Sequence, residues 1–401
     1  MFRSPLPARK LPLLVSTLNP ARAFAVWALA VAATLTGCRT EPPNHTPASA
    51  YVTNGGSGTV TVIDLLRFRP TATIRVGENP TGVAANPRKN EIYVVNSGSD
   101  NVSVIDAEHN RVVATIGVHH RPYFIDVSAD GRRGYVANSG SGNVSVLDLE
   151  KHAVVATVPV GAGPGLARVS PGGKLVVVSL RAQDAVAVLD AAKLAVRATI
   201  AVCKSPEDIA ILPDSAKTFV ACTGSAQVAA LDLTADKLLT LLDVGKTPIH
   251  LALKPDGGQI FVANYDSNTF SDITTTTNEV GGSYLIGEKP VRGVVSADNT
   301  LLYVSNFGSD TVAMFSIDTG RLLATLHVGN RPDALALTPG QDYLLVVNSG
   351  SGDVAVIRTT QVRDRRRDVD VPALRLFTLV PVGSRPNQIV VKDFMPPKPQ
   401  E

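Results

Sequence analysis

Eight short loops of the general form Val-Gly-x-x-Pro hold the side chains of this chain that are best suited to bind a ligand. Six of the eight loops place a cation at the two variable positions, and in one of these a histidine replaces the glycine to give His119-His120-Arg121. Guanidinium groups bind carboxylate and phosphate through paired hydrogen bonds, so these loops could hold an anionic group of a small molecule or a protein partner. The predicted ligand-binding residues are His119, His120, Arg121, Lys246, Lys289, Arg331 and Arg385.

The alternative for these cations is that they are ordinary solvated surface side chains. Glu78, Glu207, Glu288 and Asp333 lie in or beside the same loops and neutralise part of the positive charge. An anion-binding site at this place therefore requires that the fold brings several of the cations together around one opening.

Signatures of catalysis and of cofactor binding are absent from the sequence. It contains no Cys-x-x-Cys-His motif for c-type haem, no cluster of histidines and cysteines at zinc spacing, no Gly-x-Ser-x-Gly elbow and no P-loop. The adjacent His119 and His120 could suggest a metal or haem ligand, but two consecutive residues at a strand end usually point their rings apart. We predict no catalytic residue, no metal site and no cofactor.

The loops belong to a repeat that runs through almost the whole chain. A stretch like Tyr93-Val94-Val95-Asn96-Ser97-Gly98 occurs eight times, and each copy starts 42 residues after the last. The loop prolines also advance by 42 residues, except for a last step of 54, so the final unit carries 12 inserted residues within 358–375. The copies begin at Tyr51, Tyr93, Tyr135, Val177, Phe219, Phe261, Tyr303 and Leu345.

Each unit is predicted to form four short β-strands. In the second unit these cover residues 81–85, 92–96, 102–106 and 112–116, with turn-forming residues between them. Four strands at a period of 42 residues is the pattern of a β-propeller blade. We predict an all-β fold, a β-propeller of eight blades with seven as the alternative. The first unit lacks its inner strand, and the stretch from Pro386 to Lys392 is predicted to supply it and close the ring.

The motif Tyr51-Val52-Thr53-Asn54 and its copies resemble the YVTN-repeat β-propeller family, which is related to surface-layer propellers. The resemblance covers residues 51–394 and implies a propeller fold, although members of the family are usually described as seven-bladed. The family that the motif resembles also has distant eight-bladed relatives, which hold haem at the mouth of the propeller channel. The repeated residues themselves are interpreted as structural, because a catalytic residue is needed once and not in every blade.

The first 37 residues are predicted to be a signal peptide. Four basic residues precede the apolar run 24–33, which is too short to span a bilayer comfortably, and the segment ends Leu35-Thr36-Gly37-Cys38. This ending resembles a bacterial lipoprotein signal and implies acylation of Cys38; an ordinary signal peptide is the alternative. Residues 38–50 are predicted to be a flexible tether and 395–401 a short tail. Because Arg39 follows the cysteine, the resemblance favours the outer membrane of a two-membraned bacterium.

Charge argues against a nucleic-acid partner. The chain has a formal net charge of +3, but four basic residues and no acid lie in residues 1–37, so the remainder is slightly acidic. Binding to nucleic acid needs a clustered basic face. The predicted partners are therefore a membrane, through the lipid on Cys38, and an unknown protein or anionic small molecule. The chain is predicted to be monomeric and extracytoplasmic.

The two cysteines inside the repeat are predicted to form a disulfide. Cys203 occupies the loop glycine position of the fifth unit, and Cys222 occupies the asparagine position of the same unit. The envelope outside the cytoplasm is oxidising, and a bridge across a loop of about 20 residues contributes roughly 3 kcal/mol to stability. Two buried free thiols are the alternative.

Three function classes remain open at this point. The favoured one is a non-enzymatic envelope protein that binds a ligand or partner through the mouth of its channel. An enzyme, either lactonase-like or haem-dependent, and a purely structural surface scaffold are the alternatives. The fold cannot decide among them, because propellers host many activities.

Overall fold

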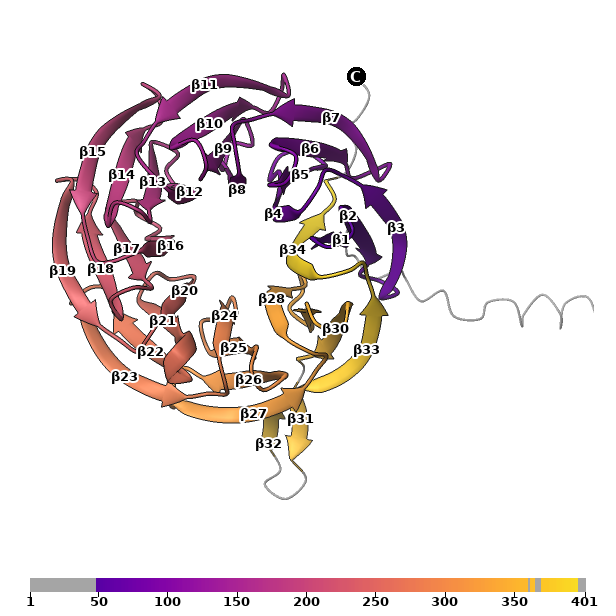
Figure 1. Cartoon of the computed structure of the whole chain (residues 1–401). Coiled ribbons are helices and arrows are strands. Elements are labelled where there is room, and N and C mark those ends of the chain that lie inside the picture. Colours follow the sequence, from indigo (N-terminus) through magenta and orange to yellow (C-terminus); the bar gives the residue numbers. More distant parts are fainter. Residues whose placement is uncertain (1–47, 360, 365–368, 396–401) are drawn as a thin grey trace, which may run out of the picture. The chain divides into compact units, whose positions relative to one another are not determined.

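The computed structural model describes residues 48–359, 361–364 and 369–395. Its strands form eight antiparallel sheets of four strands each, arranged as blades around a central axis (Figure 1). Within this described part, helix is confined to one short 3-10 turn, η1 (Tyr265–Ser267). The predicted all-β, eight-bladed propeller is confirmed.

The blades are numbered 1 to 8 along the chain, and the channel is the axial space that their innermost strands line. From blade 1 to blade 8 the innermost strands are β34 (Pro386–Asp393), β4 (Pro80–Ala85), β8 (Pro122–Val127), β12 (Pro164–Val169), β16 (Pro206–Ile211), β20 (Pro248–Leu253), β24 (Pro290–Val295) and β28 (Pro332–Leu337). The second strands are β1 (Ala48–Asn54), β5 (Glu91–Asn96), β9 (Arg133–Asn138), β13 (Leu175–Leu180), β17 (Lys217–Cys222), β21 (Gln259–Asn264), β25 (Leu301–Asn306) and β29 (Tyr343–Asn348).

The third strands, in the same order, are β2 (Thr59–Asp64), β6 (Asn101–Asp106), β10 (Asn143–Asp148), β14 (Ala185–Asp190), β18 (Gln227–Asp232), β22 (Thr269–Thr274), β26 (Thr311–Ser316) and β30 (Asp353–Arg358). The outermost strands are β3 (Arg69–Arg75), β7 (Arg111–Gly117), β11 (Ala153–Pro159), β15 (Ala195–Ala201), β19 (Lys237–Asp243), β23 (Glu279–Leu285), β27 (Arg321–His327) and β33 (Arg375–Pro381).

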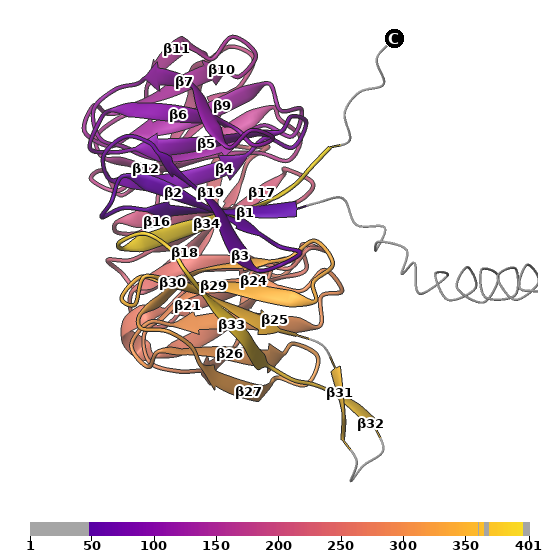
Figure 2. The ribbon, with the colours of Figure 1, turned by 90° about the vertical axis from the view of Figure 1, so that its right-hand side faces the viewer.

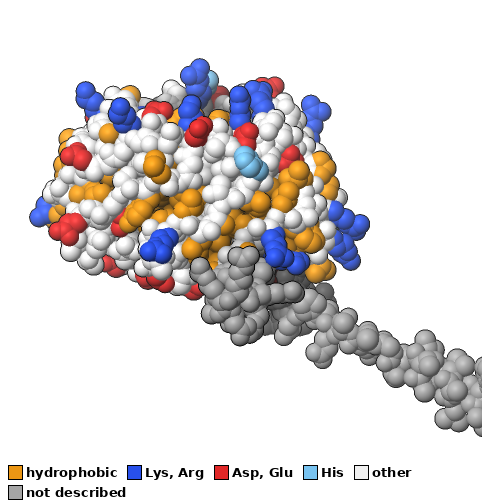
Figure 3. Space-filling view, turned by 90° about the horizontal axis from the view of Figure 1, so that it is seen from below, with side chains coloured by type: hydrophobic (Ala, Val, Ile, Leu, Met, Phe, Trp, Pro, Cys, Tyr) orange, Lys and Arg blue, Asp and Glu red, His pale blue; other side chains and the backbone are white. Residues whose placement is uncertain are grey.

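The burial of each strand follows from its place in the blade. The second strands pack against neighbouring blades on both faces, so their apolar residues are fully buried, as Ile92, Tyr93 and Val94 are in β5. The outermost strands alternate instead: in β7, Ile116 is buried and Val113 is exposed. Figure 3 shows exposed hydrophobic side chains as a band around the rim, with Lys and Arg side chains gathered mostly along one edge.

The C-terminal strand closes the ring. β34 pairs antiparallel with β1, with Tyr51 opposite Val390 and Ala48 opposite Asp393, so blade 1 takes its innermost strand from the other end of the chain. The predicted closure is therefore confirmed. β1 begins at Ala48, three residues before the predicted start, so the last residues of the predicted tether already belong to the propeller.

The insertion in blade 8 differs from its prediction. Residues 358–375 read as a charged loop, but β31 (Gln361–Asp364) and β32 (Val369–Pro372) pair as a two-stranded hairpin between β30 and β33. Its central residues 365–368 lie outside the described residues. The register places Val362 opposite Val371 and Asp364 opposite Val369.

The two faces of the ring are built from different connections. The turn after each second strand and the loop leading to the next blade form one face, which is the mouth of the channel; Gly98 N donates to Glu78 O at 3.0 Å across these two segments. The opposite face carries the start of β1, the end of β34 and the hairpin β31–β32, which emerge on the same side in Figure 2.

Candidate functional site

Hydrogen bonds to the backbone hold the mouth loops in place and leave their arginine side chains exposed. The second variable residue of each loop has a left-handed backbone, as at Arg121 (φ 51°), Arg331 (φ 54°) and Arg385 (φ 49°). An aspartate of the preceding blade fixes this geometry: Asp100 Oδ1 accepts from Arg121 N, and Asp310 Oδ1 accepts from Arg331 N, both at 2.8 Å. The carboxylates thus satisfy the loop backbone, while the arginine side chains remain exposed.

The seven predicted ligand-binding residues do not converge as one set. His120 Nδ1 lies 2.9 Å from Asp100 Oδ2, and His119 Nε2 lies 3.0 Å from Thr157 Oγ1 of the outermost strand β11. Lys289 and Arg331 do line one hollow of about 530 Å³ at the mouth. The remaining three, Arg121, Lys246 and Arg385, are exposed on separate loops.

A different group of polar residues meets inside the channel, just below the mouth. These residues lie one, two or four positions after the loop prolines, in the innermost strands, where other blades have small or apolar residues. An enclosed cavity of about 40 Å³ lies among them. Its polar and aromatic lining is Thr81, Tyr123, Phe124, Arg168, Glu207, Asp208, Arg292 and Gln388.

Two arginines of blade 4 stack on two aromatic rings of blade 3. The guanidinium of Arg168 lies 4.6 Å from the centre of the Phe124 ring, and that of Arg181 lies 4.6 Å from the centre of the Tyr123 ring. Stacking of this kind orients a guanidinium and leaves its edge free for hydrogen bonds. Gly165 makes room for the second arginine, because a Cβ there would lie 2.6 Å from Arg181 Nε.

Each of these arginines also contacts an acid of blade 5. Arg181 forms an ion pair with Glu207, and Arg168 Nη2 lies 3.7 Å from Asp208 Oδ1. Arg181 Nε is buried and has no hydrogen-bond partner among the described residues. A guanidinium has five N–H donors, so both arginines keep donors beyond those that their acids use.

Asp208 and His250 form the most buried ion pair of the channel. His250 Nδ1 lies 2.7 Å from Asp208 Oδ2, and His250 Nε2 lies 3.1 Å from Gly293 O, so both ring nitrogens face acceptors. The Asp208 carboxylate also accepts from Leu251 N at 3.0 Å and thereby joins the innermost strands of blades 5 and 6. Burial alone would raise the pKa of Asp208, but the charge and hydrogen bond of His250, with the charges of Arg168 and Arg292, hold it well below its usual range.

Three other carboxyls around the channel have pKa values that are shifted in the opposite direction, upward. Burial raises the pKa of Glu207, although Arg181 partly offsets the effect. Burial likewise raises the pKa of Asp333 in β28, where Arg292 opposes it, and of Asp126 in β8, which accepts from Val169 N. Arg292 itself forms no ion pair with any described residue, and its guanidinium lies 3.4 Å from His250 Nδ1. The channel thus combines one unpaired guanidinium with carboxyls that take up protons readily.

Sequence reasoning noticed Glu207, Asp333 and the position of His250 but did not assemble this cluster. The signal was present, since Asp208, His250 and Arg292 occupy the second position after their prolines, where Gly82 and Ala334 stand in other blades. Arg168 lies two positions further along its strand. Which of these breaks in the repeat face one another depends on how the blades stack, and spacing along the chain does not reveal it.

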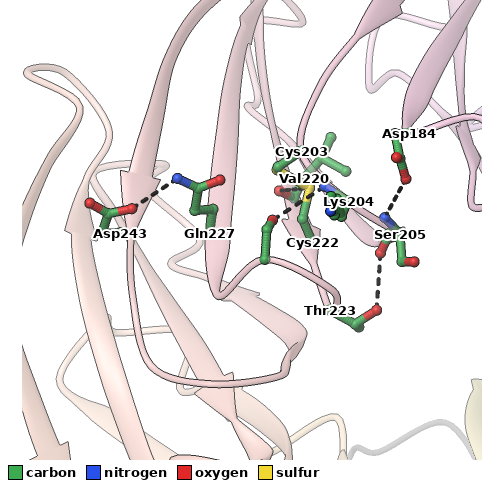
Figure 4. Close-up of a disulfide and its surroundings, with 10 residues drawn as sticks. Asp184, Cys203, Lys204, Ser205, Val220, Cys222, Thr223, Gln227 and Asp243 are labelled. Carbon is green, nitrogen blue, oxygen red and sulfur yellow. Dashed lines mark hydrogen bonds between the residues drawn. A yellow bond between two sulfur atoms is a disulfide. The ribbon is translucent and has the colours of Figure 1, made fainter.

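Cys203 and Cys222 are joined by a disulfide in blade 5 (Figure 4). Their Cα atoms are 5.7 Å apart, and the bridge links the mouth loop to the end of β17. The loop continues directly into Pro206, Glu207 and Asp208, and Pro206 is paired with Cys222. The pairing of β16 with β17 is irregular between Pro206 and Ile209, so the two acids lie in that irregular stretch next to the disulfide.

Two kinds of feature are absent from the described part of the chain, a metal-binding cluster and a membrane-spanning helix. No group of three or more His, Cys, Asp or Glu side chains there could hold a metal ion. No helix in the same residues is long and apolar enough to cross a membrane.

Two family models match parts of the chain. Residues 87–208 match the cytochrome D1 heme domain, and residues 293–373 match the 7-bladed beta-propeller lactonases. No curated protein matches the sequence significantly. Each family match covers less than a third of the chain, so these matches indicate a kind of propeller and leave the activity open.

The haem domain raises the question of whether the channel fits a tetrapyrrole. Small-molecule sites have volumes of roughly 300–1,000 Å³, whereas the channel cavity has about 40 Å³. His250 already contacts an acceptor with each ring nitrogen, and His119 and His120 are exposed on a mouth loop. The described residues of the channel therefore do not fit a haem.

Solved structures show the same architecture at low sequence identity. A dihydro-heme d1 dehydrogenase, NirN, is 17% identical, with a TM-score of 0.70 over 89% of this chain and 78% of that one. The hydrazine synthase of Kuenenia stuttgartiensis is 20% identical, with a TM-score of 0.57 over 70% and 95%. A putative 6-phosphogluconolactonase of Bacteroides uniformis is 15% identical, with a TM-score of 0.58 over 87% and 100%. Together, the eight closed blades and the two family models support membership of a β-propeller family.

Proposed function

We propose that this protein is a non-enzymatic binding protein that holds the anionic group of a small molecule at the mouth end of its propeller channel. One observation carries the proposal: the innermost strands bring the guanidinium groups of Arg168 and Arg292 to a single enclosed cavity. Arg181 lies beside them on Tyr123. A carboxylate or phosphate head fits this donor set, and the body of the ligand would extend toward the mouth.

The cavity is small enough that only the head of a ligand would enter it. About 40 Å³ corresponds to roughly three water molecules at about 10–15 Å³ each, and a ligand head would displace them. Arg292 offers its donors without competition from an ion pair, whereas Arg181 would have to exchange Glu207 for the ligand. Burial raises the pKa of Glu207, so this exchange is easier when Glu207 takes up a proton. Binding is therefore expected to strengthen as the pH falls.

The finer identity of the protein is part of the same proposal. The copies of Tyr51-Val52-Thr53-Asn54 favour a propeller of the YVTN-repeat type, and Leu35-Thr36-Gly37-Cys38 favours a lipoprotein held in the cell envelope by a lipid on Cys38. Residues 1–47 lie outside the described residues. The anchor is tested by phase partitioning: Cys38→Ser should move the protein out of the detergent phase, and unchanged partitioning would remove the anchor.

The binding function is tested by thermal unfolding of the full chain purified in detergent. The probes are benzoate, citrate and inorganic phosphate, each at several concentrations and at pH 5, 6 and 7. We expect at least one probe to raise the Tm by a few degrees, since a ligand at 100 times its Kd contributes about 2.7 kcal/mol, and to do so most at pH 5. Arg292→Met should abolish the shift.

The control is Arg321→Met, which removes an exposed arginine at the start of β27, on the face opposite the mouth. This variant should retain the full shift. If no probe raises the Tm, or if Arg292→Met and Arg321→Met respond alike, the channel does not bind anions in this way and the proposal fails.

Catalysis is the second candidate, and one observation favours it. Glu207, whose pKa burial raises, lies in the same cavity as Arg292, an arrangement in which a carboxylic acid can donate a proton to a bound substrate. The lactonase match over residues 293–373 suggests lactones as the first substrates to assay. If the protein hydrolyses a lactone and Glu207→Gln abolishes this activity, the protein is an enzyme and the proposed binding role is replaced by catalysis.

A further inference from the structure

One position of the repeat is aromatic in two neighbouring blades. It follows the last residue of each second strand, an asparagine in six blades, and opens the turn at the mouth. Six blades carry a small residue or an arginine there, and blades 6 and 7 carry Tyr265 and Phe307. From blade 1 to blade 8 the position is Gly55, Ser97, Ser139, Arg181, Thr223, Tyr265, Phe307 and Ser349.

Both aromatic rings lie half-buried under a cation from the next mouth loop. Lys289 Nζ is 5.2 Å from the centre of the Tyr265 ring, and the Arg331 guanidinium is 5.8 Å from the centre of the Phe307 ring. The Phe307 ring belongs to the hollow of about 530 Å³, which lies between the loops leading into blades 7 and 8. Its lining residues are Glu288, Lys289, Phe307, Gly308, Asp310, Asn330 and Arg331.

This lining combines hydrogen-bond donors, hydrogen-bond acceptors and an aromatic ring. Neither an anion nor an apolar group requires all three. Glu288 and Asp310 supply acceptors, Lys289 and Arg331 supply donors, and the Asn330 amide supplies both. A ligand that matches it carries many groups that donate and accept at once, together with a flat apolar face for the ring. A pyranose has this combination, since its hydroxyls do both and its C–H groups present a flat face to an aromatic ring.

We propose that the Phe307 hollow binds one unit of an oligosaccharide laid along the mouth, and that Tyr265, whose ring lies under Lys289 of the same lining, contacts the next unit. The two rings occupy equivalent positions of consecutive blades, so the sites repeat in the same orientation, as the units of a glycan do. The volume of the Phe307 hollow lies within the range of about 300–1,000 Å³ found for small-molecule sites. This inference goes beyond the channel site, because neither aromatic ring lines the channel cavity.

The repeat itself supplies variants that should fold. Serine occupies the same position in three other blades, where its hydroxyl donates to the loop carbonyl, as Ser139 Oγ does to Arg121 O at 2.8 Å and Ser349 Oγ to Arg331 O at 2.9 Å. Phe307→Ser and Tyr265→Ser therefore replace an aromatic ring by the side chain that this turn accommodates elsewhere. Phe377→Ser, at an exposed position of the rim in β33, is the matched control.

The test is binding of the full chain in detergent to an array of neutral and acidic oligosaccharides of two to six sugars, among them oligomers of N-acetylglucosamine and of galacturonate. The best binder is then titrated by calorimetry. We expect Phe307→Ser and Tyr265→Ser each to weaken binding at least tenfold with an unchanged Tm, and Phe377→Ser to bind like the unmodified protein. If no oligosaccharide binds, or if the two serine variants bind as well as the control, the proposal is overturned.

The channel and the glycan subsites can be tested separately. The Tm shift caused by benzoate, citrate or phosphate reports on Arg292 and should persist in Phe307→Ser. Loss of glycan binding with retention of this shift would support the glycan subsites, and loss of both in Phe307→Ser would mean a single disrupted mouth and would overturn the assignment.

Discussion

The carboxyl groups of Asp208 and Asp333 lie around the same channel, but their pKa values are shifted in opposite directions. Asp208 is almost fully buried and has charged partners on several sides, so its pKa falls below the usual 3.8. Asp333 is partly buried with Arg292 as its opposing charge, and its pKa rises. At Asp208 the charge of His250, its hydrogen bond and the charges of Arg168 and Arg292 together outweigh the effect of burial, whereas at Asp333 the charge of Arg292 alone does not.

Asp208→Asn should destabilise the protein at neutral pH. The change leaves His250 without its partner, and breaking a buried ion pair costs about 3–5 kcal/mol. A depressed pKa stabilises the fold at pH values above the unfolded pKa and loses that effect as the pH falls through the folded pKa. The Tm difference between variant and unmodified protein should therefore shrink below about pH 4. The control is Asp256→Asn, which removes an exposed carboxylate paired with Lys254 and should change the Tm little.

Asp333→Asn should instead stabilise the protein at neutral pH. A raised pKa means that the charged form is disfavoured in the folded state, so its cost is present at pH 7 and absent at low pH, where the group is protonated in both states. The variant should therefore have a higher Tm than the unmodified protein at pH 7 and an equal one near pH 3. A lower Tm at pH 7 would contradict the direction of the shift.

Among the structural elements, the mouth loop of blade 5 is attached to the end of its second strand by a different contact from that in blade 7. In blade 7 the loop glycine Gly287 packs directly on Asn306: a Cβ at this glycine, whose φ is +150°, would lie 2.3 Å from Asn306 Cγ. Blade 5 has Cys203 and Cys222 at these two positions, and their disulfide takes the place of that contact. Both arrangements tie the mouth loop to the end of the second strand.

This equivalence predicts how blade 5 responds to substitution. The double variant Cys203→Gly, Cys222→Asn installs the pair found in most blades and should recover much of the stability that the disulfide contributes, about 3 kcal/mol for a loop of this size. The variant Cys203→Ser, Cys222→Ser should be the less stable of the two, because it has neither the bridge nor the amide. Chemical denaturation measures both, and equal stability of the two variants would refute the equivalence. Labelling of thiols in the denatured, unreduced protein should leave both Cys203 and Cys222 unlabelled.

Most of these elements could be predicted from sequence, and the channel cluster could not. The period of 42 residues places each strand, since every copy of a motif such as Tyr93 to Gly98 must form the same structure. The contact of Arg181 with Glu207 joins the turn after the second strand of one blade to the innermost strand of the next, and both residues stand at variable positions of the repeat. Of the predicted mouth cations, Lys289 and Arg331 line one hollow, and the others lie on separate loops. Equivalent positions on eight blades lie around a ring, so equivalence in the repeat does not by itself bring their side chains to one point.

For the whole molecule, stability depends on a strand that is distant in sequence. β34 supplies the innermost strand of blade 1, and its Ile389 packs with Val52, Leu345 and Val347 in one core cluster. Removal of residues 386–401 should therefore lower the Tm of the entire propeller in a single transition, because it exposes the edge of β1 and the interface with blade 8. Removal of residues 396–401 alone is the control and should have little effect. A truncated protein that melts like the control would show that the eight blades are stable without closure.

The closure by β34 also sets the order in which the protein can be completed. β1 is made well before β34, so Tyr51 can pair with Val390 only after all the blades between them have emerged. Until then the nascent chain displays an unpaired strand edge at its oldest part and a growing row of blades behind it, which is a surface prone to pair with other chains. A cell that makes this protein must keep that edge apart from other chains during elongation, and a ribosome that stalls before Pro386 leaves it exposed for as long as the stall lasts.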